Sequence, residues 1–227
     1  MNLDPALERL LARPDIWQGR GHGTPLAGES TGFASLDAAL PAGGWPRGGL
    51  TELLPERQGI GELRLLMPAL ARLSRGARWV TWVDPPHIPY AAGLYAAGID
   101  LAHTLIVRSR DGRESLWALE QALRAGTCAA VLGWPGALED TAARRLQLAA
   151  EAGGCLGFLF RAPEARQESS FASLRLALAS ERGGLSLEML RCQGSWPGME
   201  FHLAATDLFP PAVNTNTDPA LPAGRGN

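Results

Sequence analysis

A glycine-containing turn between residues 54 and 61 has the spacing of a phosphate-binding loop. It reads Leu54-Pro55-Glu56-Arg57-Gln58-Gly59-Ile60-Gly61 and follows a short apolar run. Loops of this kind hold the phosphates of a nucleotide with a lysine ammonium group and hold Mg²⁺ with a serine or threonine hydroxyl. This chain contains no lysine, since its 21 basic side chains are all arginine. The turn therefore has no lysine for phosphate, and no residue can form a Schiff base.

The other residue types that could do chemistry are scattered. None of the four histidines has a second histidine or a carboxylate at metal-ligand spacing. The stretch Gly28–Gly32 fits the G-x-S-x-G pattern of a hydrolase nucleophile, but the residues before it do not form the strand that this motif needs. Asp84 and His87 follow a strand, yet two prolines separate them, which favours a structural role. We expect neither a metal site nor a hydrolase.

The composition indicates one globular core and no global attraction to nucleic acid. The chain has 227 residues, of which 46% are hydrophobic, and a formal net charge of −2. Cys128, Cys155 and Cys192 fit no zinc pattern, so we interpret them as buried free thiols in a reducing compartment. No apolar run approaches the length of a membrane span, and the first residues lack a signal-peptide layout. We expect a soluble cytoplasmic protein that contacts no membrane.

Strand-like and helix-like runs alternate through the middle of the chain. Apolar and β-branched runs predict strands at 50–54, 78–83, 104–107, 128–132 and 155–160. Helical periodicity predicts helices at 33–40, 61–74, 90–97, 114–124 and 138–152. Pro68 should kink the second of these helices. Strands separated by helices imply an α/β fold, with a mostly parallel twisted sheet flanked by helices.

The two ends of the chain differ from this middle part. Three strands without intervening helices make the C-terminal end of the sheet antiparallel; they are predicted at 174–179, 185–191 and 199–204. A helix is predicted over 4–13, and the tail after Phe209 is predicted to be disordered because it has no apolar pattern. The predicted domains are an N-terminal helix and linker at 1–27, a core at 28–208 and a tail at 209–227.

Several motifs follow one another in a recognisable order from Ser30 onward. Ser30-Thr31-Gly32 comes before Ser35-Leu36-Asp37, and the glycine-rich stretch 42–48 comes before the strand at 50–54 and the turn at 55–59. This order resembles the RecA recombinase core, in which S/T-G-x-x-x-L-D and G-G-x-P-x-G precede a strand and a phosphate loop. The resemblance extends to about His202 and implies a RecA-like core.

The groups that do chemistry in that family are missing at the matching positions. Ile60 stands at the lysine, Gly61 at the magnesium-binding hydroxyl, and Leu54 at a glycine that lets backbone approach phosphate. Pro86 stands about where the family has the acidic residue that activates water, and Gly133 lies where the family has the aspartate that holds Mg²⁺. The comparison implies a protein that is not an enzyme and carries no cofactor, although backbone N–H groups could still hold a weak anion.

A pair of arginines lies where the family has its second DNA-binding loop. Arg161 also matches the family's nucleotide-sensing glutamine, and Arg166 follows shortly after it. Arginine in a flexible loop can bind phosphate with two hydrogen bonds, so contact with single-stranded DNA is one interpretation. Glu164 and Glu168 dilute this charge, which favours the other interpretation, a solvated loop of mixed charge.

Tryptophans and leucines supply the candidate partner contacts. Trp79, Trp82 and Trp134 fall in or beside strands and are predicted to lie in the core. Trp17 and Trp196 lie outside the predicted helices of the core, and exposed tryptophan is enriched at binding sites, although local packing explains them equally well. The other candidates share one face of the helix at 4–13; they are Leu7, Leu10 and Leu11.

A RecA-like core that stops near residue 205 and lacks nucleotide chemistry is similar to the ImuA family, which is related to RecA and to the cell-division inhibitor SulA. The opening from Leu11 to Arg20 also resembles the start of that family. The resemblance implies an adaptor in SOS-induced translesion DNA synthesis. Its partners would be an ImuB-like inactive Y-family polymerase and an error-prone replicative-type polymerase.

Three alternatives stay open on the sequence. The first is a SulA-like inhibitor of cell division that binds FtsZ. The second is a working ATP-dependent recombinase, against which Ile60 and Pro86 argue. The third is an inactive relative that docks on the end of a RecA filament through the helix at 4–13.

Overall fold

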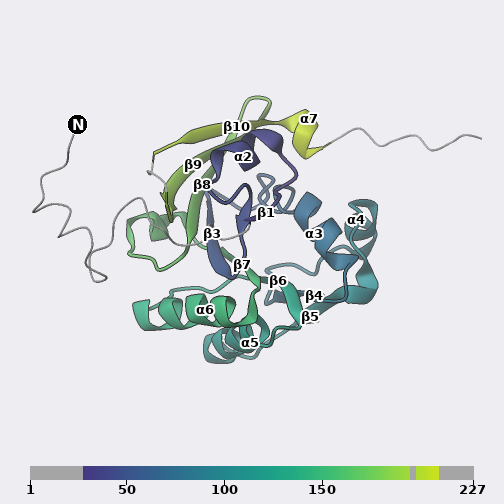
Figure 1. Ribbon diagram of the computed structural model, residues 1–227, viewed down its shortest axis with the longest axis vertical. Helices are drawn as coiled ribbons and strands as arrows, with labels where there is room; N and C mark the ends of the chain where they lie inside the picture. The colour runs from purple at the N-terminus through teal and green to yellow at the C-terminus, as the bar shows by residue number, and fades with distance from the viewer. Residues whose placement is uncertain (1–27, 195–197, 210–227) are drawn as a thin grey trace, which may run out of the picture.

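The computed structural model describes residues 28–194 and 198–209, which form a sheet with helices on both faces (Figure 1). Six neighbouring strands of this sheet run parallel. In spatial order they are β8 Leu174–Glu181, β3 Gly49–Pro55, β7 Leu156–Phe160, β6 Cys128–Gly133, β4 Trp79–Val83 and β5 Thr104–Val107. The predicted helix at 4–13 and the tail after Phe209 lie outside the described residues.

Two further strands extend the sheet beyond β8 with antiparallel pairing. They are β9 Gly184–Cys192 and β10 Glu200–Ala204. A separate two-stranded sheet joins β1 Gly28–Glu29 to β2 Trp45–Pro46. The mixed α/β fold, with a mostly parallel sheet and an antiparallel C-terminal end, is therefore confirmed.

The helices divide between the two faces of the sheet. One face carries α2 Ala34–Ala39, α3 Met67–Ser74 and α4 Ala91–Ala96; the other carries α5 Gly112–Arg124 and α6 Asp140–Gly153 (Figure 1). Successive strand residues point to opposite faces. Leu132 and Phe158 accordingly join the core under α3, whereas Val131 and Leu159 join the core under α5 and α6. The remaining short helices are η1 Leu101–His103, η2 Pro163–Gln167 and α7 Ala205–Leu208.

The prediction of one helix over 61–74 is wrong in its first half. Residues 61–66 form turns, and α3 begins only at Met67. Gly59 and Gly61 have φ values of +82° and +113°, which a helix does not accept. Pro68 lies in the first turn of α3, where its missing N–H costs no hydrogen bond, so it starts the helix instead of kinking it.

Trp82 lies in the core as predicted, but Trp79 does not. Trp82 is 1% exposed, whereas Trp79 is 40% exposed and its ring lies 5.8 Å from that of His103. Trp79 is the first residue of β4, and only the edge strand β5 lies beyond it in the sheet, so few elements can cover its ring. Trp134 is partly buried against the core.

The cysteines are all free thiols. Cys128 and Cys155 are buried, and Cys192 is half-buried. Burial raises the pKa of Cys155 to about 12, so this thiol stays protonated at neutral pH. Within residues 28–194 and 198–209, no helix combines the length and apolar character needed to cross a membrane.

Candidate functional site: a blocked phosphate loop beside an apolar cavity

The turn that resembles a phosphate loop starts at the carboxyl end of β3, near the middle of the sheet. Leu54 and Pro55 are buried members of β3. Glu56 continues the strand, because its N–H donates to the carbonyl of Leu178 at 2.9 Å and its carboxylate accepts from the N–H of Ser180 at 3.0 Å. The chain therefore stays beside β8 for one residue longer before it turns.

The backbone amides of the turn are already occupied by a carboxylate. Glu62 accepts the N–H of Gly59 at 2.9 Å on one oxygen and the N–H of Gly61 at 3.1 Å on the other. These are the groups that would face a phosphate in a working loop. Ile60, at the position of the lysine, packs its apolar side chain against the core. The expected helix start is not at this turn, because α3 begins only at Met67, and Glu62 already takes the two amides.

The space for the aspartate that holds Mg²⁺ is also filled. Gly133 is the last residue of β6, and a Cβ atom built on it would lie 2.4 Å from the Cδ2 of Leu119 in α5. A side chain at Gly133 would therefore require Leu119 to move. The position is shaped for packing between β6 and α5.

A cavity of about 500 Å³ lies beside the blocked turn. The carboxyl ends of β4 and β6, the turn, the segment 85–90 and helix α4 contribute to its walls. The lining is mainly aromatic, proline and aliphatic, with Trp82, Trp134, Tyr90 and Met67 among its members, and its polar part consists of Gln58, Glu62, Arg64 and His87. Three of the rings in this region form a continuous stack: Trp134 lies 4.5 Å from Phe160 and 6.0 Å from Trp82. An apolar cavity of this kind suits a neutral apolar group better than a triphosphate.

Asp84 fixes the start of the cavity wall at 85–90. Its φ is +49°, an unusual value for a residue other than glycine. Ser109, which follows β5, donates to its carboxylate through the backbone N–H at 2.8 Å and through the hydroxyl at 2.5 Å. Burial raises the pKa of Asp84, but the hydrogen bonds from Ser109 and Ser115 outweigh it, so the pKa lies below the usual range. The Asp84 carboxylate therefore holds the ends of β4 and β5 together. The next residues, Pro86 and His87, are exposed.

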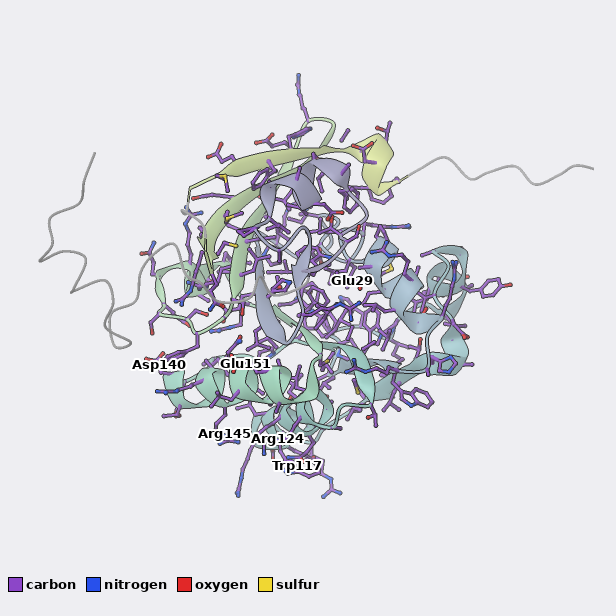
Figure 2. The ribbon with its side chains drawn as sticks, viewed as in Figure 1. Glu29, Trp117, Arg124, Asp140, Arg145 and Glu151 are labelled. Carbon is purple, nitrogen blue, oxygen red and sulfur yellow. The ribbon has the colours of Figure 1, made fainter. Side chains whose placement is uncertain are left out.

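The motif at Ser30–Asp37 is also structural. The carboxylate of Asp37 accepts the hydroxyl of Ser30 at 2.6 Å and the N–H of Thr31 at 2.7 Å. Burial raises the pKa of Asp37, but these hydrogen bonds lower it further than burial raises it. A Cβ atom on Gly32, whose φ is +94°, would lie 2.4 Å from Pro68, so this glycine lets the motif pack on α3. Glu29, labelled in Figure 2, strengthens this contact by pairing with Arg72 of α3 at 3.4 Å.

Arg161 is buried and paired, so its prediction as a DNA contact in a flexible loop is wrong. Its side chain is 4% exposed and lies 3.5 Å from Glu52 of β3, which is 1% exposed. Arg161 also pairs with Glu168 at 2.6 Å, and Arg175 of β8 donates to Glu52 at 2.7 Å. The second guanidinium also donates to the carbonyls of Ala165 and Glu168 at 2.7 and 3.0 Å. Buried charges require such partners.

Arg166 lies apart from this buried cluster. Its side chain is 44% exposed and pairs with Glu188 of β9 at 2.5 Å. The hydrogen bond to Glu188 raises the pKa of Arg166 above the usual value for arginine. The two arginines that the sequence placed together therefore face different surroundings, one inside the protein and one on its surface.

Sequence reasoning missed Glu52 and Arg175, although a signal was present. A glutamate inside an otherwise apolar central strand needs a buried cation, and only arginine was available in this chain. The predicted partner contacts Leu7, Leu10, Leu11, Trp17 and Trp196 all lie outside the described residues. The described part adds Trp117 of α5, which is 61% exposed; Figure 2 shows it at the outer side of α5 and α6, with Arg124 and Arg145. Both of these arginines bind Glu120, at 2.8 Å for Arg124.

Comparison with known proteins defines the class first. Residues 49–157 match the family model described as cell division inhibitor SulA. SulA of Edwardsiella piscicida is 38% identical over 104 residues, which are 45% of this chain and 61% of that protein. The crystal structure of SulA from Pseudomonas aeruginosa is 30% identical, covers 49% of this chain and 97% of its own, and aligns with a TM-score of 0.43. Residues 49–157, from β3 to the start of β7, are thus similar to SulA.

A longer match identifies the family. Protein ImuA of Caulobacter vibrioides is 32% identical over an alignment of length 204 that covers 78% of this chain and 84% of that protein. The chain belongs to the ImuA family. The match to the SulA of Edwardsiella piscicida, in contrast, leaves more than a third of that relative outside the alignment.

Proposed function

We propose that this protein is a non-catalytic accessory factor of SOS-induced translesion DNA synthesis, built on a RecA-like core that no longer binds nucleotide. Membership in the ImuA family supports the biological role. The observation that carries the absence of catalysis is the contact of Glu62 with the amides of Gly59 and Gly61. A resident carboxylate repels a triphosphate at short range, and no lysine is available to offset it.

The partner is an ImuB-like inactive Y-family polymerase, with an error-prone replicative-type polymerase in the same assembly in the cytoplasm. The test is to mix the purified chain with the ImuB-like protein of its own organism and to separate the mixture by size-exclusion chromatography. We expect co-elution at micromolar concentration without added nucleotide. Separate elution of the two proteins under these conditions would contradict the proposal.

A second candidate is a division inhibitor that binds FtsZ, favoured by the match to the SulA model over residues 49–157. An FtsZ polymerisation assay separates the two functions. A protein of the translesion machinery leaves the polymer mass unchanged when it is added at equimolar concentration. A SulA-like protein reduces the polymer mass under the same conditions.

Contact with RecA is the third part of the proposal and rests on the helix predicted at 4–13. Co-sedimentation with RecA filaments on single-stranded DNA tests it. The full chain should pellet with the filaments, and a chain lacking residues 1–13 should stay in solution. Equal pelleting of the two forms would remove the role of this segment.

A further inference from the structure

The cavity beside the blocked turn has the chemistry of a peptide-binding groove. Its wall combines tryptophan and tyrosine rings with three prolines; the prolines are Pro85, Pro86 and Pro89. Aromatic-lined grooves of this type bind proline-rich segments, which need little ordering because they already favour an extended helix. Trp82, which is 1% exposed and lines the cavity, has a buried indole N–H with no hydrogen-bond acceptor among the described residues. Such a group favours an occupant that supplies a carbonyl oxygen.

The described chain ends next to this cavity. Helix α7 is followed by Phe209, and the guanidinium of Arg64 lies 5.0 Å from the centre of its ring. Arg64 is itself one of the residues that line the cavity. The next residues in the sequence are Pro210-Pro211-Ala212-Val213, so a proline-rich segment starts at the edge of an aromatic groove.

We propose that the cavity binds the chain's own C-terminal segment, with residues 210–213 seated between the tryptophan wall and the segment 85–90. Four residues in a polyproline conformation span about 12 Å, and Arg64, which lines the cavity, lies 5.0 Å from the ring of Phe209. The carbonyls of such a segment are free to accept hydrogen bonds, and the indole N–H of Trp82 is one of four buried donors without a partner among the described residues and the one that belongs to the cavity lining. Residues 210–227 carry one aspartate and one arginine, so no net charge opposes their entry.

This inference does not depend on the proposed role in translesion synthesis. It requires neither nucleotide nor polymerase, and it concerns a cavity that the missing ATPase groups leave apolar. A partner peptide and the tail of a second copy are the other occupants that the experiment must separate.

The experiment follows the indole signals of the full-length protein by ¹H–¹⁵N NMR. The Trp82 signal is assigned by its loss in Trp82→Phe. The test variant replaces Pro210, Pro211 and Val213 by serine in the full chain, which keeps its length and keeps Phe209. If the segment fills the cavity about nine-tenths of the time, hydrogen exchange at the Trp82 indole should speed up about tenfold in this variant, the factor that corresponds to 1.4 kcal/mol.

A matched control places the same change further along the tail. Replacing Ala220, Leu221 and Pro222 by serine should leave the Trp82 signal where it is in the wild type. A chain that ends at Phe209 should behave like the 210–213 variant. A second route blocks the cavity itself: Ala97→Phe adds a ring to its lining and should displace the segment, so that adding the 210–213 changes to Ala97→Phe should alter the Trp82 exchange rate no further.

The outcomes are distinct. A Trp82 signal with the same position and exchange rate in all tail variants would overturn the proposal, because the cavity would then be unoccupied by this segment. A dimer in sedimentation that the 210–213 variant abolishes would also overturn it, because the tail would then bind a second copy. Changes confined to the 210–213, truncated and Ala97→Phe forms, in a monomer, would establish it.

Discussion

At the scale of single residues, Glu62 decides what the turn after β3 can hold. Ile60 removes the cation, but the loss of a cation alone would leave two backbone N–H groups free for an anion. The carboxylate of Glu62 binds both of these groups, at 2.9 and 3.1 Å, and so adds a negative charge where a phosphate would lie. Ile60 does not attract a phosphate, and the Glu62 carboxylate repels one, so both residues weaken phosphate binding at the same turn.

Glu62→Ala should restore weak anion binding to the turn. In a titration with inorganic phosphate, the amide NMR signals of Gly59 and Gly61 should move at millimolar phosphate in the variant and stay fixed in the wild type. Glu56→Ala is the matched control, because it removes the same charge from the neighbouring strand end but leaves Glu62 in place. Equal responses of the two variants would mean that phosphate responds to the net charge of the region and not to the two amides that Glu62 occupies.

Glu52 is the residue that makes the buried arginines tolerable. Glu52→Gln keeps the shape but leaves Arg161 and Arg175 without their shared anion, and should lower the free energy of unfolding by about 3–5 kcal/mol. Glu188→Gln, which breaks the exposed pair with Arg166, should cost only about 0–1 kcal/mol. Denaturant unfolding measures both values. A cost below about 1 kcal/mol for Glu52→Gln would show that the cluster is open to water.

The lack of lysine could be read from the sequence, but the contacts that fill the matching positions could not. The assignment of Ile60 and Pro86 to the lysine and acidic positions rests on the resemblance to the RecA core. The contact of Glu52 with Arg161 joins residues that are 109 positions apart, and that with Arg175 joins residues 123 apart, so only the sheet order brings them together. The same holds for Leu119, whose side chain takes the space at Gly133.

At the scale of elements, the joint between β4 and β5 positions the cavity wall. The N–H of Asp84 donates to the carbonyl of Val107 at 3.0 Å, and Ser109 returns two hydrogen bonds to the Asp84 carboxylate. Arg108 donates to the carbonyl of Pro85 at 2.5 Å. The ends of the two strands are thereby tied to the proline-rich segment that lines the cavity.

The hydrogen bonds of Asp84 should make the free energy of unfolding depend on pH in the acid range. The folded-state pKa of Asp84 is below its usual value, so its contribution is fully present above the unfolded pKa of about 3.9 and is lost as the pH falls through the lower folded value. Asp84→Asn should therefore be less stable than the wild type at pH 7, and the difference should shrink below about pH 4. Thermal unfolding at several pH values measures this. A difference that stays constant down to pH 3 would contradict the assignment.

The strands were easier to predict than the helix after the turn. The strand predicted at 104–107 agrees with β5, because its apolar run is bounded on both sides by polar residues. The helix predicted at 61–74 failed because apolar spacing continues through residues whose backbone is set by Gly59 and Gly61. Periodicity reports which side chains are buried and does not report the backbone angles of glycine.

At the scale of the whole molecule, the carboxyl-end edge of the parallel strands is the part of the sheet that bears on function. The carboxyl ends of parallel strands are where α/β proteins usually bind ligands. Here that edge carries a blocked turn, a space filled by Leu119 and an apolar cavity. The match to ImuA of Caulobacter vibrioides covers 84% of that protein, so the similarity extends well beyond this one edge of the sheet.

The most direct test of the central claim is equilibrium binding of Mg²⁺·ATP to the full-length protein, followed by calorimetry. A turn without lysine, closed by Glu62, should give no saturable binding up to millimolar nucleotide, with or without single-stranded DNA. Magnesium-dependent binding in the micromolar range, weakened by Ile60→Asp, would contradict the account, because the turn would then hold the triphosphate that its own carboxylate is proposed to exclude.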